Sequence, residues 1–281
     1  MNYIQYKTLD KEYIIKKIKE FFKEDIPAGD ITTNATITAK DNIQANIVTE
    51  EKCIFSGENI IKYFFPQCKV EINVKDGEKT KNNIIIGTIK GSANTILSNE
   101  RIMLNLIQRL CGIATNTNKY VTLANNKIKI LDTRKTTPGL RLFEKYAVTC
   151  GGGYNHRLNL SKGHLIKDNH LITNKSISSI ITNIKKTPNY KPIEVEVDTI
   201  EQVKKILPLN IDGFLLDNMQ QSEIKACVSI IKQYNNKIFI EASGGISLDN
   251  LSRFLDTGID AVSIGALTHQ AQNINIKLEF I

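Results

Sequence analysis

The chain has 281 residues, a formal charge of +8 at pH 7 and no tryptophan. This length is enough to bury the core of one large domain or of two smaller ones. Its lysines are spread along the chain among asparagines and isoleucines, and no basic stripe interleaved with aromatic residues stands out. Diffuse lysine is typical of a solvated surface, so we expect no nucleic-acid partner. Small anionic substrates remain compatible with the charge.

The sequence gives no sign of a membrane or secreted protein. No apolar run reaches the length of a membrane span. The amino-terminal stretch mixes charges through its apolar residues, so we expect an amphipathic helix near residues 10–22 and no signal peptide. The five cysteines are odd in number, scattered and without a CxxC pair. We therefore expect reduced thiols, a cytoplasmic location and no membrane partner.

The first block is predicted to combine a small sheet with helices. Pro27 and Gly29 mark a turn after the first helix. Strand-like stretches follow at 43–49, 68–74 and 84–87, with a helix expected after the sequence SGEN at 56–59. A long apolar-periodic helix is predicted to open at Ser98 and run to about Ala124, bridging two domains. Residues 273–281 alternate like a strand and are expected to return to the sheet of the first block.

The second block repeats one pattern six times between residues 130 and 266. A short apolar run ends in charged, hydroxyl or glycine residues, and segments of helical length separate most of the runs. This rhythm predicts a βα barrel whose strand ends form one site. The strand ends carry Arg134 and Lys135, Lys167 and Asp168, Glu196 and Asp198, Asp217, Ser243-Gly244-Gly245, and Gly265.

The last two strand ends indicate phosphate binding. A strand leads into Ser243-Gly244-Gly245, and the next leads into a turn that begins with Gly265. Glycine lets backbone amides approach an anion closely. Either segment alone could be a simple turn, but their combination favours a phosphate site.

Cations and glycines are concentrated between residues 131 and 171. Three arginines and four lysines lie there, together with His156 and a run of three glycines. Cations this close repel one another unless an anion joins them. Guanidinium groups suit carboxylates because they offer two parallel donors.

These segments resemble the quinolinate phosphoribosyltransferase family. The resemblance covers nearly the whole chain in order and spacing, and it rests on GDITT, SGEN, NERIMLNLIQRLCGIAT, DTRKTTPGLR, EKYAV, GGGYNHR, LIKDNH, EVEV, LLDNM, EASGGI and SIGALTH. It implies an α/β protein with an irregular, incomplete βα barrel at 115–269. It also implies an α/β sandwich-like domain at 1–114, joined by a carboxyl-terminal strand within 270–281.

The resemblance also implies an activity. A member of this family transfers phosphoribose from phosphoribosyl pyrophosphate to quinolinate with decarboxylation. The products are nicotinate mononucleotide, pyrophosphate and carbon dioxide, in de novo NAD biosynthesis. A homodimer with shared active sites is expected, with higher assemblies possible.

Carried over residue by residue, the resemblance predicts the site. The quinolinate ligands would be Arg101 from the partner subunit, Arg134, His156, Arg157 and Lys167. Lys135 and Lys167 would lie between the two substrates, and Glu196 and Asp217 would hold Mg²⁺ partly through water. The catalytic residues would be Lys135, Lys167, Glu196 and Asp217. The phosphoribosyl pyrophosphate site would comprise Lys135, Glu196, Asp217, Ser243, Gly244, Gly245 and Gly265.

Several residues have simpler interpretations. His164, His170 and His269 lack the spacing of metal ligands and are expected to make structural hydrogen bonds. Cys150 has no evident base and is expected to pack. By strand alternation Glu194, Glu196 and Asp198 share one side, so only some are expected to face the site. Asn159, Lys162 and Gln270 depart from the family pattern, which leads us to expect glycine, aspartate and serine at these positions. Asparagine is the next best residue for a left-handed backbone, whereas Lys162 reverses a charge.

Two other functions are compatible with parts of this sequence. A barrel homologue associated with molybdenum transport shares much of the scaffold, but the intact EKYAV and LIKDNH segments disfavour it. A non-catalytic basic protein that binds nucleic acid or phosphorylated ligands is the more distant alternative.

Overall fold

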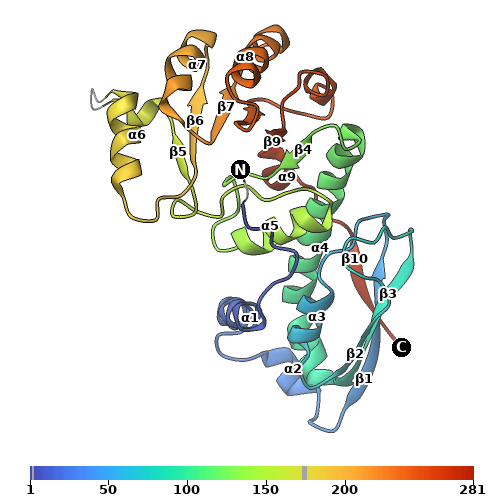
Figure 1. The fold of residues 1–281 in the computed structure, drawn as a ribbon. Coiled ribbons are helices and arrows are strands. Elements are labelled where there is room, and N and C mark those ends of the chain that lie inside the picture. Colours follow the sequence, from blue (N-terminus) through green and yellow to red (C-terminus); the bar gives the residue numbers. More distant parts are fainter. Residues whose placement is uncertain (2, 173–175) are drawn as a thin grey trace. The chain divides into compact units, whose positions relative to one another are not determined.

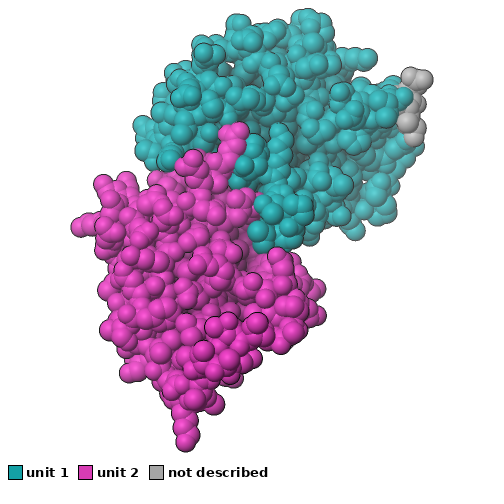
Figure 2. Space-filling model, turned by 180° about the vertical axis from the view of Figure 1, so that it is seen from behind, with its two compact units in different colours: residues 1–5, 119–141, 153–269 teal, residues 6–118, 142–152, 270–281 magenta. Residues whose placement is uncertain are grey.

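The computed structural model describes residues 1, 3–172 and 176–281. The chain divides into two compact units, shown in different colours in Figure 2. Unit 1 comprises residues 1–5, 119–141 and 153–269, and unit 2 comprises residues 6–118, 142–152 and 270–281. In the described part of the chain, no helix is long and apolar enough to cross a membrane.

Unit 2 is built on a four-stranded antiparallel sheet in the order β10-β1-β3-β2. Its strands are β1 (Asn42–Thr49), β2 (Lys69–Ile72), β3 (Ile84–Ser92) and β10 (Ile276–Phe280). The last strand pairs with the first, with Ile47 opposite Leu278. The carboxyl-terminal strand therefore returns to the sheet of the first block, as the alternation of residues 273–281 predicts.

Helices lie on one face of this sheet (Figure 1). They are α1 (Lys11–Asp25), α2 (Ile31–Thr36), α3 (Glu58–Phe64), α4 (Ala93–Ala124) and α5 (Arg141–Cys150). Asp10 caps α1 and Asp30 caps α2, each accepting a backbone N–H of the first turn through its carboxylate. The last residues of α4 and the first residue of α5 belong to unit 1.

Unit 1 is built on a six-stranded parallel sheet in the order β4-β9-β8-β7-β6-β5. Its strands are β4 (Lys129–Leu131), β5 (His164–Ile166), β6 (Ile193–Val197), β7 (Gly213–Asp217), β8 (Phe239–Ser243) and β9 (Ala261–Ser263). Tyr154 adds a parallel bridge to Leu131 on the free side of β4. The six predicted strands and the predicted α/β class are confirmed.

Helices lie beside this sheet in Figure 1. They are α6 (Ile177–Lys186), α7 (Ile200–Ile206), α8 (Gln221–Tyr234) and α9 (Ala266–His269), with 3-10 turns at Asp168–His170, Leu207–Leu209 and Leu251–Phe254. Only a 3-10 turn connects β8 to β9 in place of a full helix, which makes this βα unit irregular.

The two faces of the parallel sheet differ in character. Register partners share a face and successive residues alternate. One face therefore carries buried apolar residues such as Val195, Phe214 and Ile240. The opposite face carries the polar side chains Glu194, Glu196, Asp217, Glu241 and Ser243. Glu194 and Glu196 share this face as predicted, whereas Asp198 lies beyond the strand and is exposed.

One sequence prediction needs correction, and one short helix was not predicted. The long helix begins at Ala93, not at Ser98, because β3 passes directly into α4 without a loop. The turn at Pro27 and Gly29 is followed by a short helix, α2, that the sequence analysis did not anticipate. The predicted amphipathic helix, the helix after residues 56–59 and the strands of the first block are confirmed.

The pairing of β10 with β1 gives a stability prediction. Leu278 is 8 % exposed on β10, whereas its neighbour Glu279 is exposed. Leu278→Ala removes buried methyl groups and should lower the free energy of unfolding by about 2–3 kcal/mol. Glu279→Ala, which removes a surface ion pair with Lys277, should change it by less than about 0.5 kcal/mol. Urea unfolding of the two variants measures the difference, and equal losses would show that β10 does not contribute to the core.

Candidate active site

Residues at the carboxyl ends of the parallel strands form the candidate site of unit 1. Arg134 and Lys135 follow β4, Lys167 follows β5, and Gly265 follows β9. Glu196 lies within β6, while Asp217 and Ser243 end β7 and β8. Parallel strands present these ends at one edge of the sheet, so the topology gathers residues that are distant in sequence.

Arg134 and Arg157 both lie at this edge, and the charge of Arg134 acts on Arg157. Arg157 is 7 % exposed, and its Nη1 donates to the carbonyl of Gly163 at 2.8 Å. Burial and the nearby Arg134 guanidinium lower the pKa of Arg157. The Nε of Arg134 is buried and has no hydrogen-bond acceptor among the described residues. Two neighbouring guanidinium groups with an unused donor favour binding of a carboxylate.

Lys135 lies against Gly265. A Cβ on Gly265 would be 2.8 Å from Lys135 Cδ and 3.1 Å from His269 Nε2, so a larger residue would require these side chains to shift. The Thr268 hydroxyl fixes the Lys135 backbone by donating to its carbonyl at 2.7 Å. The Lys135 side chain is exposed and lies next to Gly265, at the start of the turn that is predicted to bind phosphate.

Asp217 and the glycine turn after β8 form a second connected group. The Ser243 hydroxyl donates to Asp217 Oδ1, and the Asn218 amide donates to Oδ2 at 2.7 Å. Gly244 has a φ of +101° and Gly245 a φ of +58°. A Cβ on Gly244 would lie 2.1 Å from Asn218 Oδ1, whereas no heavy atom lies within 4 Å of a Cβ on Gly245. The chain therefore packs tightly at Gly244 and leaves open space at Gly245.

Lys167 and Glu196 form an ion pair at the ends of β5 and β6. The side chains remain 39 % and 17 % exposed, so both can be reached from solvent. Together with Asp217 they line a pocket of about 270 Å³ that also includes Asp168 and Asp198. This pocket offers one ammonium group and several carboxylates close to the glycine turns.

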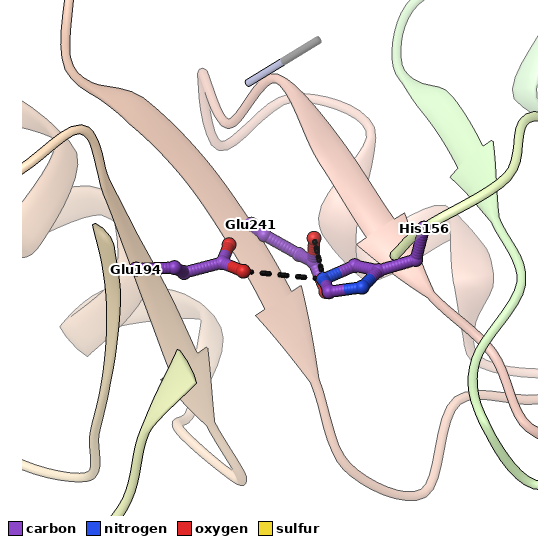
Figure 3. A group of neighbouring side chains, drawn as sticks. All are labelled: His156, Glu194 and Glu241. Carbon is purple, nitrogen blue, oxygen red and sulfur yellow. Dashed lines mark hydrogen bonds and ion pairs between the residues drawn. The ribbon is translucent and has the colours of Figure 1, made fainter. Parts of the chain in front are cut away.

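His156 lies in a buried cluster with Glu194 and Glu241 (Figure 3). Its Nε2 is 3.1 Å from Glu194 Oε2 and 3.6 Å from Glu241 Oε2. Its Nδ1 accepts the backbone N–H of Arg157 at 2.8 Å. Burial alone would lower the pKa of His156, but the charges of Glu241, Glu194 and Asp132 raise it. Burial and the charge of Glu194 raise the pKa of Glu241 to about 7.

The amino-terminal residues hold the segment that carries His156 and Arg157. The Tyr3 hydroxyl donates to Glu194 Oε2 at 3.2 Å, and the Tyr3 ring lies 4.5 Å from the His156 ring between centroids. Gln5 pairs with the backbone of Asn155, donating to its carbonyl at 3.1 Å and accepting its N–H at 2.7 Å. This segment is therefore fixed on both sides.

The remaining predicted residues lie outside these groups. Arg101 is exposed on α4 in unit 2. His170 accepts the N–H of Lys167 through Nδ1 at 3.0 Å, a structural bond of the kind predicted. His164 and His269 belong to no group of potential metal ligands among the described residues. Burial raises the pKa of Cys150 to about 12, consistent with a packed thiol.

Of the departures from the family pattern, Asn159 does not take the left-handed conformation that would replace a glycine. It accepts the Ser161 N–H through its side chain. Lys162 and Gln270 are exposed.

Sequence reasoning missed Tyr3, Gln5 and Glu241. Glu241 carries a recognisable signal, because a charged residue in the run FIEAS alternates onto the polar face of a buried strand. Tyr3 and Gln5 carry none, because their partners are more than 140 residues away in sequence.

Comparison with known proteins decides the family. The C-terminal domain of quinolinate phosphoribosyl transferase matches residues 113–279, and its N-terminal domain matches residues 30–111. The chain belongs to the quinolinate phosphoribosyltransferase family.

Other members of this family match the chain over nearly its full length. A probable nicotinate-nucleotide pyrophosphorylase (carboxylating) of Bacillus subtilis is 39% identical and covers 99% of this chain and 94% of the relative. One from Methanocaldococcus jannaschii is 38% identical, covering 96% and 98%. The solved structure of the nicotinate-nucleotide pyrophosphorylase from Francisella tularensis has a TM-score of 0.91 and 35% identity, covering 100% of both chains.

The glycine turn after β8 yields a paired prediction. Gly244→Ala would force a methyl group against Asn218 at a left-handed φ, so we expect a loss of about 3 kcal/mol or more in unfolding free energy. Gly245→Ala meets open space and should lose only about 1 kcal/mol. Urea unfolding distinguishes the two, and a larger loss for Gly245→Ala would contradict the described turn.

Proposed function

We propose that this protein transfers phosphoribose from phosphoribosyl pyrophosphate to quinolinate and removes one carboxyl group, giving nicotinate mononucleotide, pyrophosphate and carbon dioxide. Family membership supports the reaction. The observation that carries it is the pair Arg134 and Arg157: burial and then the charge of Arg134 lower the pKa of Arg157, and the buried Nε of Arg134 is an unused donor among the described residues. Such a pair suits an acceptor with two carboxylates.

The proposed mechanism relies on placement and charge. Arg134 and Arg157 bind the quinolinate carboxylates, while the turns at Ser243–Gly245 and Gly265 bind the 5′-phosphate of the donor. Lys135 and Lys167 lie between the substrates and neutralise developing negative charge. Attack of the ring nitrogen on the ribose carbon releases pyrophosphate. The resulting cationic ring nitrogen stabilises the electron pair left on the neighbouring carbon when carbon dioxide departs, and a proton from solvent then adds to that carbon.

Glu196 and Asp217 are proposed to hold Mg²⁺, partly through water. They fit this cation because they supply carboxylate oxygens from neighbouring strands and line one pocket. When bound, the metal would add positive charge beside the pyrophosphate. Glu196 is paired with Lys167, so binding exchanges this ion pair for contacts with substrate and metal.

A homodimer with shared sites is proposed, with Arg101 entering the site of the partner subunit. The exposed position of Arg101 on α4 is compatible with such a role. We further propose a cytoplasmic location and place the reaction in de novo NAD biosynthesis.

Acceptor specificity tests the proposed function. Purified protein with phosphoribosyl pyrophosphate, magnesium and quinolinate should form nicotinate mononucleotide. Nicotinate has one carboxylate and leaves a cation unpaired, so its kcat/KM should be lower by roughly 100-fold or more. Product formation measured by liquid chromatography and mass spectrometry checks both acceptors. Equal turnover of the two would contradict the assignment of two arginines to a dicarboxylate.

Metal dependence is the second functional prediction. Excess chelator should abolish turnover, and magnesium should restore it. Glu196→Gln and Asp217→Asn should each lower kcat/KM by roughly 100-fold, because each removes charge that holds the donor complex. Glu201→Gln, an exposed change on α7, serves as the control and should remain active. Full activity in the presence of chelator would rule out the metal role.

Sharing of the site between subunits predicts complementation. Arg101→Ala and Lys167→Ala homodimers should both be nearly inactive. Mixing them under conditions that exchange subunits places both intact residues in one site of each mixed dimer. Random exchange of equal amounts should restore roughly a quarter of wild-type activity. If mass spectrometry shows exchange but no activity returns, Arg101 acts within its own chain.

A further inference from the structure

The buried cluster of His156, Glu194 and Glu241 is not explained by carboxylate binding. His156 is 6 % exposed, and both ring nitrogens are engaged within the protein. Because Nδ1 accepts the Arg157 N–H, the ring proton resides on Nε2 and points to Glu194. A ring in this tautomer has no N–H directed at a substrate.

Burying a carboxyl group raises the free energy of the folded protein, so the two buried glutamates are expected to have a function. Both are 0 % exposed and lie on the polar face of the parallel sheet, on β6 and β8. Glu194 accepts the Tyr3 hydroxyl and faces His156. Glu241 makes no hydrogen bond of good geometry among the described residues, and its nearest polar neighbours are His156 Nε2, 3.6 Å from Oε2, and the Ser263 hydroxyl. A charged carboxylate in such surroundings is strongly disfavoured, and a protonated one is not.

The groups that face Glu241 come from every neighbouring segment. They are Glu194 on β6, His156 in the segment after α5, Asp132 after β4, and the Ser263 hydroxyl on β9. Burial and the charges of Glu194 and Glu241 raise the pKa of Tyr3. Two of these groups, Glu194 and Asp132, are carboxylates, so a proton on Glu241 relieves repulsion between carboxylates.

The cluster connects to the substrate site through one residue. Besides the bond from Arg157 N–H to the ring, the His156 N–H donates to Asp132 Oδ1 at 2.8 Å. These bonds fix the backbone of Arg157, whose guanidinium lies beside Arg134. A shift of the His156 ring would therefore move Arg157.

We propose that Glu194 and a protonated Glu241 are positioning residues that hold the His156 ring, and that His156 anchors Arg157 instead of binding substrate itself. This rests on the proposed function and revises the role that the resemblance implies for His156. It predicts that the neutral amide of glutamine can replace Glu241, whereas Glu194 is needed as an acceptor.

Stability across pH tests the protonation of Glu241. An acid whose pKa is higher in the folded protein than in the unfolded chain favours folding at low pH, and this contribution is lost as pH rises between about 5 and 8. The urea midpoint of Glu241→Gln should therefore rise relative to that of the wild type over this range. Glu201→Gln is the matched exposed control and should show no such trend. Parallel curves for Glu241→Gln and wild type would overturn the protonated state.

The tautomer of His156 is tested by ¹⁵N NMR of histidine-labelled protein. His156→Asn identifies the signals, since the chain has only four histidines. At pH 6, below the pKa of about 7 of Glu241, that carboxyl is protonated and its charge no longer raises the pKa of His156, so a neutral ring with its proton on Nε2 is expected and should persist at saturating quinolinate. A change to a doubly protonated ring on quinolinate binding would make His156 a substrate ligand and overturn the proposal.

Enzyme kinetics test whether Glu194 and Glu241 position His156 and, through it, Arg157. Glu194→Ala should raise the KM for quinolinate at least tenfold and leave the KM for phosphoribosyl pyrophosphate unchanged. Glu194→Gln keeps an acceptor and should restore most of the loss, while Glu241→Gln should stay within about twofold of wild type. If Glu241→Gln is as impaired as Glu194→Ala, or if elemental analysis finds one zinc per wild-type chain that Glu241→Gln loses, the cluster has an ionised or metal-binding role instead. The stability and NMR measurements need no turnover, so their outcome is separate from failure of the proposed function.

Discussion

Repulsion between Arg134 and Arg157 is the constraint on which the site depends. Arg157 is buried, and the neighbouring guanidinium lowers its pKa. Like charges held together in this way raise the free energy of the folded protein, and an anion that joins them lowers it. We therefore propose that this arrangement favours binding of a dicarboxylate. Much of the surrounding structure, from the Gly163 carbonyl to the Asn155 segment, keeps Arg157 in place.

The parallel sheet explains how one site collects residues from positions 134 to 265. Its polar face carries two groups of carboxylates, one buried and one lining a pocket. Glu194 and Glu241 are fully buried on this face, whereas Glu196 and Asp217 lie further along the strands and line the pocket. Period-two alternation generates both groups from the same strands, since Glu194 and Glu196 are two residues apart. One strand therefore supplies a structural carboxylate and a proposed metal ligand.

Much of this organisation could be predicted from the sequence. The six strands and their polar ends are encoded locally by apolar runs, and the carboxyl-terminal strand by its alternation. The start of α4 was misplaced because no turn residue separates it from β3. The roles of Tyr3 and Gln5 could not be predicted, because their hydrogen-bond partners are distant in the sequence and produce no local sequence pattern. The family resemblance implied a ligand role for His156, but only the three-dimensional contacts reveal that both ring nitrogens are already engaged.

Calorimetric titration of quinolinate, without the second substrate, tests the central claim most directly. The two arginines should supply most of the binding free energy, so Arg157→Met should weaken quinolinate binding by roughly 100-fold. Lys162→Met removes an exposed cation from the same region and should leave the affinity within about threefold of wild type. If Arg157→Met binds quinolinate as tightly as wild type, the adjacent guanidinium groups are not the dicarboxylate site and the account fails.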